Sequence, residues 1–88
     1  MEASDLMTRR TPPLAPHAAR LLAVLREEPR SVRRAGYDAC LTDSAAAAAA
    51  RTLVRRGFAE QENEAGTVLR LTPAGCIAKA QQRGRGVV

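Results

Sequence analysis

Two arginines and a serine fall on one face of a helix that the sequence predicts over residues 43–56. At 100° per residue, four residues share this face with i, i+4, i+7 and i+11 spacing: Ser44, Ala48, Arg51 and Arg55. Arginine binds phosphates through the planar fork of its guanidinium group as well as through its charge. The small residues before the arginines would let the first half of the helix lie close to a large anion. An ordinary solvated helix is the alternative that this pattern allows.

The opposite face of the same helix carries small side chains and one leucine. The residues within about 60° of Leu53 on the helical wheel are Ala46, Ala49, Ala50 and Gly57. Such a face permits a close approach to other helices. The helix can begin at any of three good N-cap residues, Thr42, Asp43 and Ser44. A B-DNA major groove, roughly 12 Å wide, admits a helix of this kind.

Two further helices are predicted before this one. Pro16 suits the first turn of a helix, and Pro29 would end it. An apolar face with i, i+3, i+4 and i+7 spacing is made by Ala18, Leu21, Leu22 and Leu25. A short second helix over residues 30–40 begins at Ser31 or Arg30. A tight turn joins it to the third helix.

The hydrophobic period changes after the third helix. Strands near residues 58–63 and 67–72 flank a glycine-containing turn at Glu64–Gly66, which predicts a β-hairpin. Thr72 then caps a last helix that has Pro73 at its first position.

The element order predicts a mainly α fold with a small β-hairpin: a three-helix core, a two-stranded hairpin and a C-terminal helix. The 88 residues suffice for one domain, expected over residues 16–83. A flexible, basic and proline-rich tail is predicted over residues 1–15, and a second flexible tail over 84–88. The expected large core residues are Leu21, Leu22, Leu25, Leu53, Phe58, Leu69, Leu71 and Ile77.

The charge balance indicates a polyanionic partner. Thirteen of the fourteen basic residues are arginine, and the formal net charge is +5. A basic small domain most often binds nucleic acid, although a GC-rich genome also encodes many alanines and arginines.

The sequence contains no secretion-signal pattern and no run near the ~20 apolar residues that span a bilayer. We therefore expect a cytoplasmic protein that does not contact a membrane.

The residue set disfavours catalysis. His17 is the only histidine, and two distant cysteines, Cys40 and Cys76, complete no zinc site. The sequence has no glycine-rich phosphate loop, and Ser44 has no plausible base. We therefore predict a protein that is not an enzyme, has no metal or cofactor, and keeps both thiols free.

Two motifs carry a resemblance to a known family. "LVRRGF" at the end of the alanine-rich helix and "LRLTPAG" at the end of the hairpin together resemble the winged helix-turn-helix of bacterial regulators, especially the MarR-type family. The resemblance covers roughly residues 18–82. It implies a DNA-binding transcriptional regulator of bacterial or phage type, with the 43–56 helix in the major groove and the hairpin, or wing, near the minor groove. It further implies homodimers on a palindromic site of double-stranded DNA.

The predicted DNA-binding residues combine this resemblance with the arginine face. They are Thr42, Ser44, Ala48, Arg51, Thr52, Arg55, Arg56, Arg33, Arg34 and Arg70. We expect Arg51 and Arg55 to supply much of the affinity. Ser44 and Thr52 would supply the base reading, since alanine can only meet a thymine methyl group.

The sequence departs from the family pattern in three ways. The 43–56 helix offers few base-reading side chains. The wing is acidic, because Glu60, Glu62 and Glu64 accompany a single basic residue, Arg70. The long flanking helices through which the family dimerises are missing. These departures leave open a second function, a winged-helix adaptor or inhibitor that binds another protein through the acidic hairpin and does not read DNA.

Overall fold

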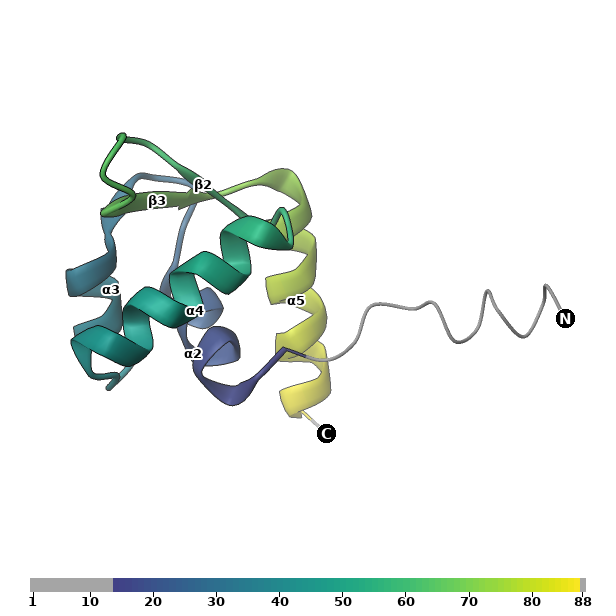
Figure 1. Cartoon of the computed structure of the whole chain (residues 1–88). Coiled ribbons are helices and arrows are strands. Elements are labelled where there is room, and N and C mark those ends of the chain that lie inside the picture. Colours follow the sequence, from purple (N-terminus) through teal and green to yellow (C-terminus); the bar gives the residue numbers. More distant parts are fainter. Residues whose placement is uncertain (1–13, 88) are drawn as a thin grey trace, which may run out of the picture.

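The computed structural model describes residues 14–87, with side chains for residues 14–82. Within that range the chain forms four helices and a small antiparallel sheet, and Figure 1 shows β2 and β3 of this sheet lying across one end of the helices. In chain order the elements are α2 (Pro16–Val24), β1 (Arg30–Ser31), α3 (Val32–Asp38), α4 (Asp43–Arg55), β2 (Ala59–Gln61), β3 (Val68–Leu71) and α5 (Pro73–Val87). This order confirms the predicted mainly α fold with a three-helix core, a hairpin and a C-terminal helix.

The two tails that the sequence predicts are only partly covered by the described residues. Residues 1–13 and Val88 lie outside the described residues. α5 extends to Val87, so residues 84–87 are helical where the sequence predicts a tail. Glycine lowers helix propensity by only about 1 kcal/mol relative to alanine. A helix that has already nucleated can therefore continue through the two glycines in this stretch.

α2 ends well before Pro29, which the sequence predicts as its end. Leu25 already has an extended backbone, with φ −77° and ψ 153°, and its side chain is buried. The next carbonyl, that of Arg26, accepts a hydrogen bond from the Leu71 backbone N–H at 2.9 Å. Lys79 Nζ donates to the Leu25 carbonyl at 2.8 Å. The helix ends early because these contacts hold the chain against β3 and α5.

The sheet contains a third strand that the sequence pattern misses. β1 pairs with one edge of β3, and β2 pairs with the other, both antiparallel. The register places Arg30 opposite Leu69. A strand of two residues is too short to show an alternating pattern. Ser31 also caps α3, since its Oγ accepts a hydrogen bond from the Arg34 backbone N–H at 3.0 Å, so Ser31 rather than Arg30 begins the second helix.

The core consists of leucines and alanines. Its largest fully buried side chains are Leu21, Leu22, Leu25, Leu53 and Leu69. Leu71 is also buried, but Phe58 is only half-buried and Ile77 is 61% exposed, so the expectation was wrong for these two. α5 packs against α2 through Lys79 and Gln82, whose side chains donate to backbone carbonyls at α2. This orientation leaves Ile77 on the outer side of α5.

The alanine run of α4 is a packing face. Ala46, Ala49, Ala50 and Leu53 are buried, as the helical wheel predicts. Gly36 of α3 lies so close to α4 that a Cβ added to it would stand 2.6 Å from the Ala46 Cβ. Small residues on both helices therefore allow α3 and α4 to come into close contact.

The "LTPAG" motif fastens α5 to the end of α4. The Thr72 hydroxyl donates to the Gly57 carbonyl at 2.6 Å and accepts from the Gly75 backbone N–H at 3.0 Å, which confirms Thr72 as the cap. Gly57 has φ +80°, a conformation that favours glycine. A Cβ at Gly75 would collide with the Phe58 carbonyl oxygen. Three residues of the two sequence motifs thus have a steric or hydrogen-bonding reason for their identity.

Candidate nucleic-acid interface

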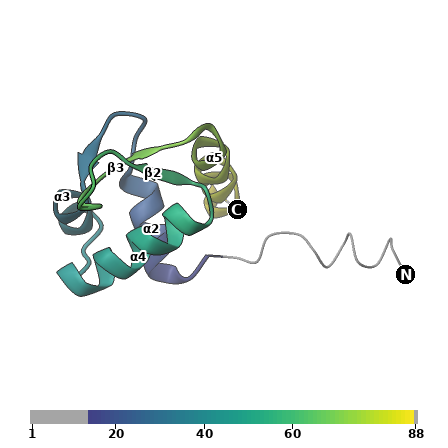
Figure 2. The ribbon, with the colours of Figure 1, turned by 45° about the horizontal axis from the view of Figure 1, so that its top comes forward.

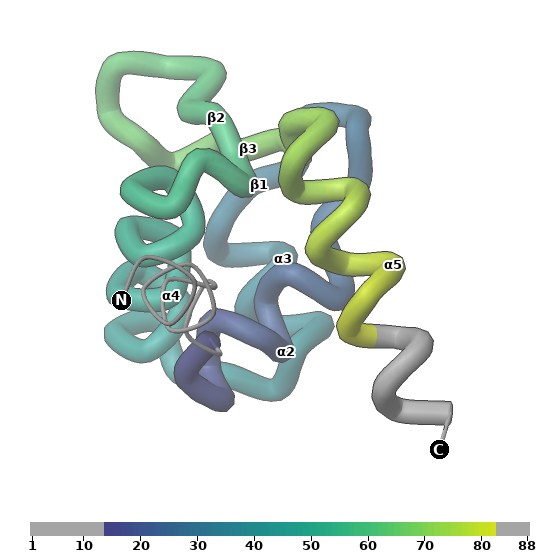
Figure 3. Tube along the Cα trace, turned by 90° about the vertical axis from the view of Figure 1, so that its right-hand side faces the viewer, coloured from purple at the N-terminus to yellow at the C-terminus, as the bar shows by residue number. Residues whose placement is uncertain are grey.

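α4 presents its predicted polar face to the outside of the molecule. α4 lies in front of α2 in Figure 1, and Figure 3 shows α4 and the hairpin loop on one side with α5 on the other. All four residues of the arginine face are exposed: Ser44, Ala48, Arg51 and Arg55. The helical wheel therefore predicted the outer face correctly, and of the predicted inner face only Gly57 is wrong, because it lies beyond the end of α4 and is exposed.

Arg51 and Arg55 carry charges that no carboxylate neutralises among the described side chains. The ion pairs in that part of the chain involve Arg30, Arg34 and Arg70, and neither arginine of the α4 face takes part in them. Arg55 lies in the last turn of α4, where the helix dipole favours a cation. Two positive charges on one outward face make α4 suited to a polyanion.

The hydroxyl groups predicted to read bases differ in their availability. Thr42 is the N-cap of α4, and its Oγ1 accepts from the Ala45 backbone N–H at 3.1 Å. Thr52 Oγ1 donates to the Ala48 carbonyl one turn earlier, at 3.2 Å. Ser44 Oγ has no partner among the described side chains and is exposed. Ser44 is therefore the hydroxyl on this face that can both donate to and accept from a ligand.

Arg56 lies at the edge of this face. It is the C-cap of α4, and its guanidinium carbon stands 5.5 Å from the centre of the Phe58 ring. A cation over an aromatic face at this distance is attracted by the ring. The Arg56 side chain is thereby held toward the start of the wing.

The arginines of α3 occupy a neighbouring surface. Arg33 is exposed and unpaired among the described side chains. Arg34 stands 3.8 Å from Asp38, and the Asp38 carboxylate binds Arg30 more closely, at 2.7 Å. The Arg30–Asp38 pair joins β1 to α3, and Arg34 stays largely exposed.

The wing engages its own basic residue. β2 and β3 place Glu60 opposite Arg70, and the Arg70 guanidinium donates to Glu60 at 3.0 Å and also to Glu62. The hydrogen bond to Glu62 raises the pKa of Arg70 above its usual value. Glu64, at the hairpin loop, is exposed. Unlike the arginines of α4, Arg70 is already bound by two carboxylates.

The hairpin loop is held by one asparagine. Asn63 Oδ1 accepts from the backbone N–H groups of Thr67 and Val68, at 3.0 and 3.2 Å, and its Nδ2 donates to the Thr67 hydroxyl at 2.7 Å. Gly66, with φ +72°, completes the turn. Figure 2 shows the resulting hairpin above α4. This turn sets the register that brings the glutamates to Arg70.

Comparison with known proteins supports the assignment of this arrangement to a known fold. No protein-family model and no curated protein matches the sequence. The structure is similar to the crystal structure of the multiple antibiotic-resistance repressor (MarR) from Listeria monocytogenes 4b F2365, with a TM-score of 0.71 and 22% sequence identity. The chain is a winged helix-turn-helix domain. The match covers 93% of this chain and 54% of the repressor chain, so the domain spans about half the length of that protein.

The elements of this chain correspond to the parts of a winged helix. α3 and α4 form the helix-turn-helix, and β2 and β3 form the wing. The structure brings Ser44, Ala48, Arg51 and Arg55 together on one surface, whereas Arg33 and Arg34 lie on α3. Sequence reasoning missed the binding of Arg70 by two glutamates, although the strand register that causes it follows from the hairpin.

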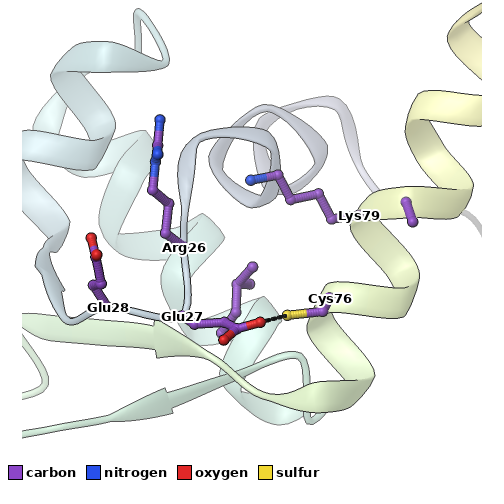
Figure 4. A pocket seen from close by; sticks show the side chains of 7 residues that line it. Arg26, Glu27, Glu28, Cys76 and Lys79 are labelled. Carbon is purple, nitrogen blue, oxygen red and sulfur yellow. Dashed lines mark hydrogen bonds between the residues drawn. The ribbon is translucent and has the colours of Figure 1, made fainter.

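A separate groove lies between the segment after α2 and α5. It has a volume of about 400 Å³ and is lined by Arg26, Glu27, Glu28, Leu71, Cys76, Lys79 and Ala80. Figure 4 shows the Cys76 thiol donating to Glu27, at 3.4 Å. Burial is the main cause that raises the pKa of the Cys76 thiol. The groove therefore places the Cys76 thiol among charged groups of both signs.

Within the described residues, no three His, Cys, Asp or Glu side chains gather where they could hold a metal ion. Cys40 and Cys76 are free thiols. No helix in the described range is both long and apolar enough to cross a bilayer.

Proposed function

We propose that this winged-helix domain is a DNA-binding transcriptional regulator that inserts α4 into the major groove of double-stranded DNA. The observation that carries the proposal is the outward face of α4, where Arg51 and Arg55 are exposed without carboxylate partners among the described side chains. A net charge of +5 adds a general attraction to phosphates. The structural similarity to a repressor agrees with this role.

Residues near the start of α4 would contact bases, and residues near its end would contact phosphates. Ser44, near the N-terminus of α4, would approach base edges, and Ala48 would meet a thymine methyl group. Arg55 lies about 17 Å along the helix axis from Ser44, so it would bind the phosphate backbone rather than bases. Arg51, between them, would also bind phosphates. Such contacts give affinity with little dependence on sequence.

Further residues of the predicted set would contribute at the edges. Thr42, Thr52 and Arg56 flank the α4 face, and Arg33 and Arg34 extend the basic surface onto α3. Arg70 would contribute least, because Glu60 and Glu62 already bind it.

We propose that the domain acts as a homodimer on two half-sites and works in the cytoplasm, where it would meet the DNA that it regulates.

A salt series of DNA-binding measurements tests the proposal. Wild type, Arg51→Ala and Arg55→Ala are titrated against one labelled duplex at several salt concentrations. Each variant should bind more weakly, and the slope of log K against log salt should become shallower by about 1. Arg26→Ala is the matched control, because it removes an exposed arginine from the groove beside α5. Equal binding by all four proteins would refute the proposed interface.

The same measurements distinguish DNA binding from the second hypothesis, a protein adaptor. A protein adaptor would bind no duplex even at low salt, and the three glutamates of the wing would then be the surface to examine.

Size-exclusion chromatography with light scattering, with and without a palindromic duplex, tests the homodimer. A single copy bound to each palindrome would contradict it.

A further inference from the structure

Asp43 begins α4 as an exposed carboxylate, and none of the ion pairs among the described side chains includes it. The positions three and four residues later, where a cation would pair with it on the helix, hold Ala46 and Ala47. Asp43 is not the cap either, because the Thr42 hydroxyl accepts from the Ala45 backbone N–H at 3.1 Å. Within the domain, the Asp43 carboxylate is therefore left with only its general attraction to the helix dipole.

The start of α4 stands clear of the rest of the domain. Thr42, Asp43 and Ser44 are three consecutive exposed residues. The other end of the helix is joined to α5 by the hydrogen bond from Thr72 to the Gly57 carbonyl, and Figure 1 shows α4 beginning beside α3 and ending near α5. Because Cα–Cβ bonds in a helix tilt toward its N-terminus, the side chain of the first residue extends toward the open end. A groove that receives the start of α4 therefore meets Asp43 together with Ser44.

Asp43 differs from its neighbours in the fixed polarity of its hydrogen bonding. The Ser44 hydroxyl can donate or accept, so it fits more than one base, and the Thr52 hydroxyl already donates to the Ala48 carbonyl at 3.2 Å. The alanines offer only methyl groups. An ionised carboxylate carries acceptors and no donor. In the first turn of α4, Asp43 is thus the side chain that can distinguish a base that donates from one that accepts.

We propose that Asp43 makes the domain select cytosine, by accepting a hydrogen bond from the cytosine N4 amino group in the major groove. Guanine and thymine present no donor at this edge, so they repel a carboxylate. The adenine amino group stands between two acceptors, its own N7 and the O4 of the paired thymine. The cytosine amino group has an acceptor on one side only, the O6 of the paired guanine.

The Asp43 carboxylate also opposes binding to a wrong site. It repels phosphates and base acceptors, so a duplex without the matching cytosine pays this repulsion and gains no hydrogen bond. Arg51 and Arg55 would supply affinity for any sequence, and Asp43 would subtract from it wherever the cytosine is missing. This inference rests on the proposed DNA-binding function and adds a base preference to it.

Selection from a library of duplexes with a randomised centre tests the base preference of the full chain. The wild-type pool should contain a position in each half-site that is strongly enriched in cytosine. Asp43→Ala should lose the preference at that position alone. Asp43→Asn should shift it toward adenine, because an amide can bind the N6 and N7 of adenine together. Glu64→Ala is the matched control, since it removes an exposed carboxylate from the wing and should leave every base preference unchanged.

Two duplexes that differ only at the selected position measure the size of the effect. Wild type should bind the cytosine duplex about fivefold to a hundredfold more tightly than the duplex with that base pair changed. Asp43→Ala should bind the two duplexes equally. It should also bind the changed duplex more tightly than wild type does, because the repulsion is removed. Thermal unfolding of each variant checks that the fold is retained.

The outcomes separate the base preference from DNA binding itself. If wild type binds no duplex at low salt, the DNA-binding function fails and the role of Asp43 fails with it. If Arg51→Ala weakens binding but Asp43→Ala keeps the wild-type base preferences, the function stands and the role of Asp43 is overturned. Wild type that binds DNA but enriches no cytosine also overturns it. Loss of the cytosine preference in Asp43→Ala, with unchanged preferences in Glu64→Ala, supports it.

Discussion

The outer face of α4 and the wing both expose arginine, but only α4 leaves it available. Among the described side chains, Arg51 and Arg55 have no carboxylate partner, whereas Arg70 of the wing is bound by Glu60 and Glu62. The cause lies in backbone geometry. Residues i, i+4 and i+7 of a helix share a face, so the sequence of α4 groups arginines with serine and alanine. An antiparallel hairpin instead brings together residues that are distant in sequence, and here it pairs unlike charges.

The two regions are also supported differently. α4 rests on the core through Leu53 and three alanines, so its outer face is as firmly held as the domain itself. The wing has two short strands, and the hydrogen bonds of Asn63 close its loop on an exposed surface. We therefore expect changes beneath α4 to alter global stability, and changes in the wing to alter local charge. The following predictions test that contrast.

Truncation of Leu53 should have the largest effect. Leu53→Ala removes a fully buried side chain beneath α4 and should cost about 2–5 kcal/mol of unfolding free energy. In so small a domain this loss can unfold the protein. Urea denaturation followed by circular dichroism measures it. A loss below about 0.5 kcal/mol would mean that Leu53 does not anchor α4.

Gly75→Ala should destabilise the domain at the point where α5 packs against the segment between α4 and the wing. The new Cβ would collide with the Phe58 carbonyl, just before the wing begins, and should cost about 1–3 kcal/mol through overpacking. Ala80→Gly is the control, because it lies exposed on the same helix and costs only about 1 kcal/mol in helix propensity. Thermal unfolding that ranks Ala80→Gly as the more damaging change would contradict the close packing of α5.

Removal of arginine should affect DNA binding in α4 more than in the wing. Arg55→Ala should weaken binding to all sequences and reduce the salt slope by about 1. Arg70→Ala should change the slope much less, because its charge is already matched by carboxylates. Fluorescence anisotropy at several salt concentrations compares the two. Equal salt slopes for the two variants would mean that Arg70 is as available to DNA as Arg55, which contradicts the contrast between α4 and the wing.

Neutralising the wing should have the smallest effect, and of opposite sign. Glu60→Gln with Glu62→Gln removes repulsion from phosphates and releases Arg70, so binding should tighten and the salt slope should steepen. The gain should be modest, because exposed ion pairs contribute about 0–1 kcal/mol. The same anisotropy series measures it. Weaker binding by this double variant would indicate that the wing glutamates themselves contact the partner.

Several features of this domain follow from short stretches of sequence. The two faces of α4, the Thr42 cap, and the Thr72–Pro73 start of α5 depend on residues within about one helical turn of one another. The hairpin follows from its glycine turn in the same way. Local hydrogen bonds and side-chain spacing decide these features, so the amino-acid sequence alone predicts them correctly.

The remaining features depend on partners far along the chain, so only the tertiary structure decided them. β1 exists because Arg30 and Ser31 meet β3, and α2 ends early because Leu25 and Arg26 bind Lys79 and Leu71. The outward position of Ile77 follows from the polar side chains that α5 turns toward α2. In each case the competing local preference is worth a fraction of a kcal/mol per residue, which one long-range hydrogen bond or a buried leucine outweighs.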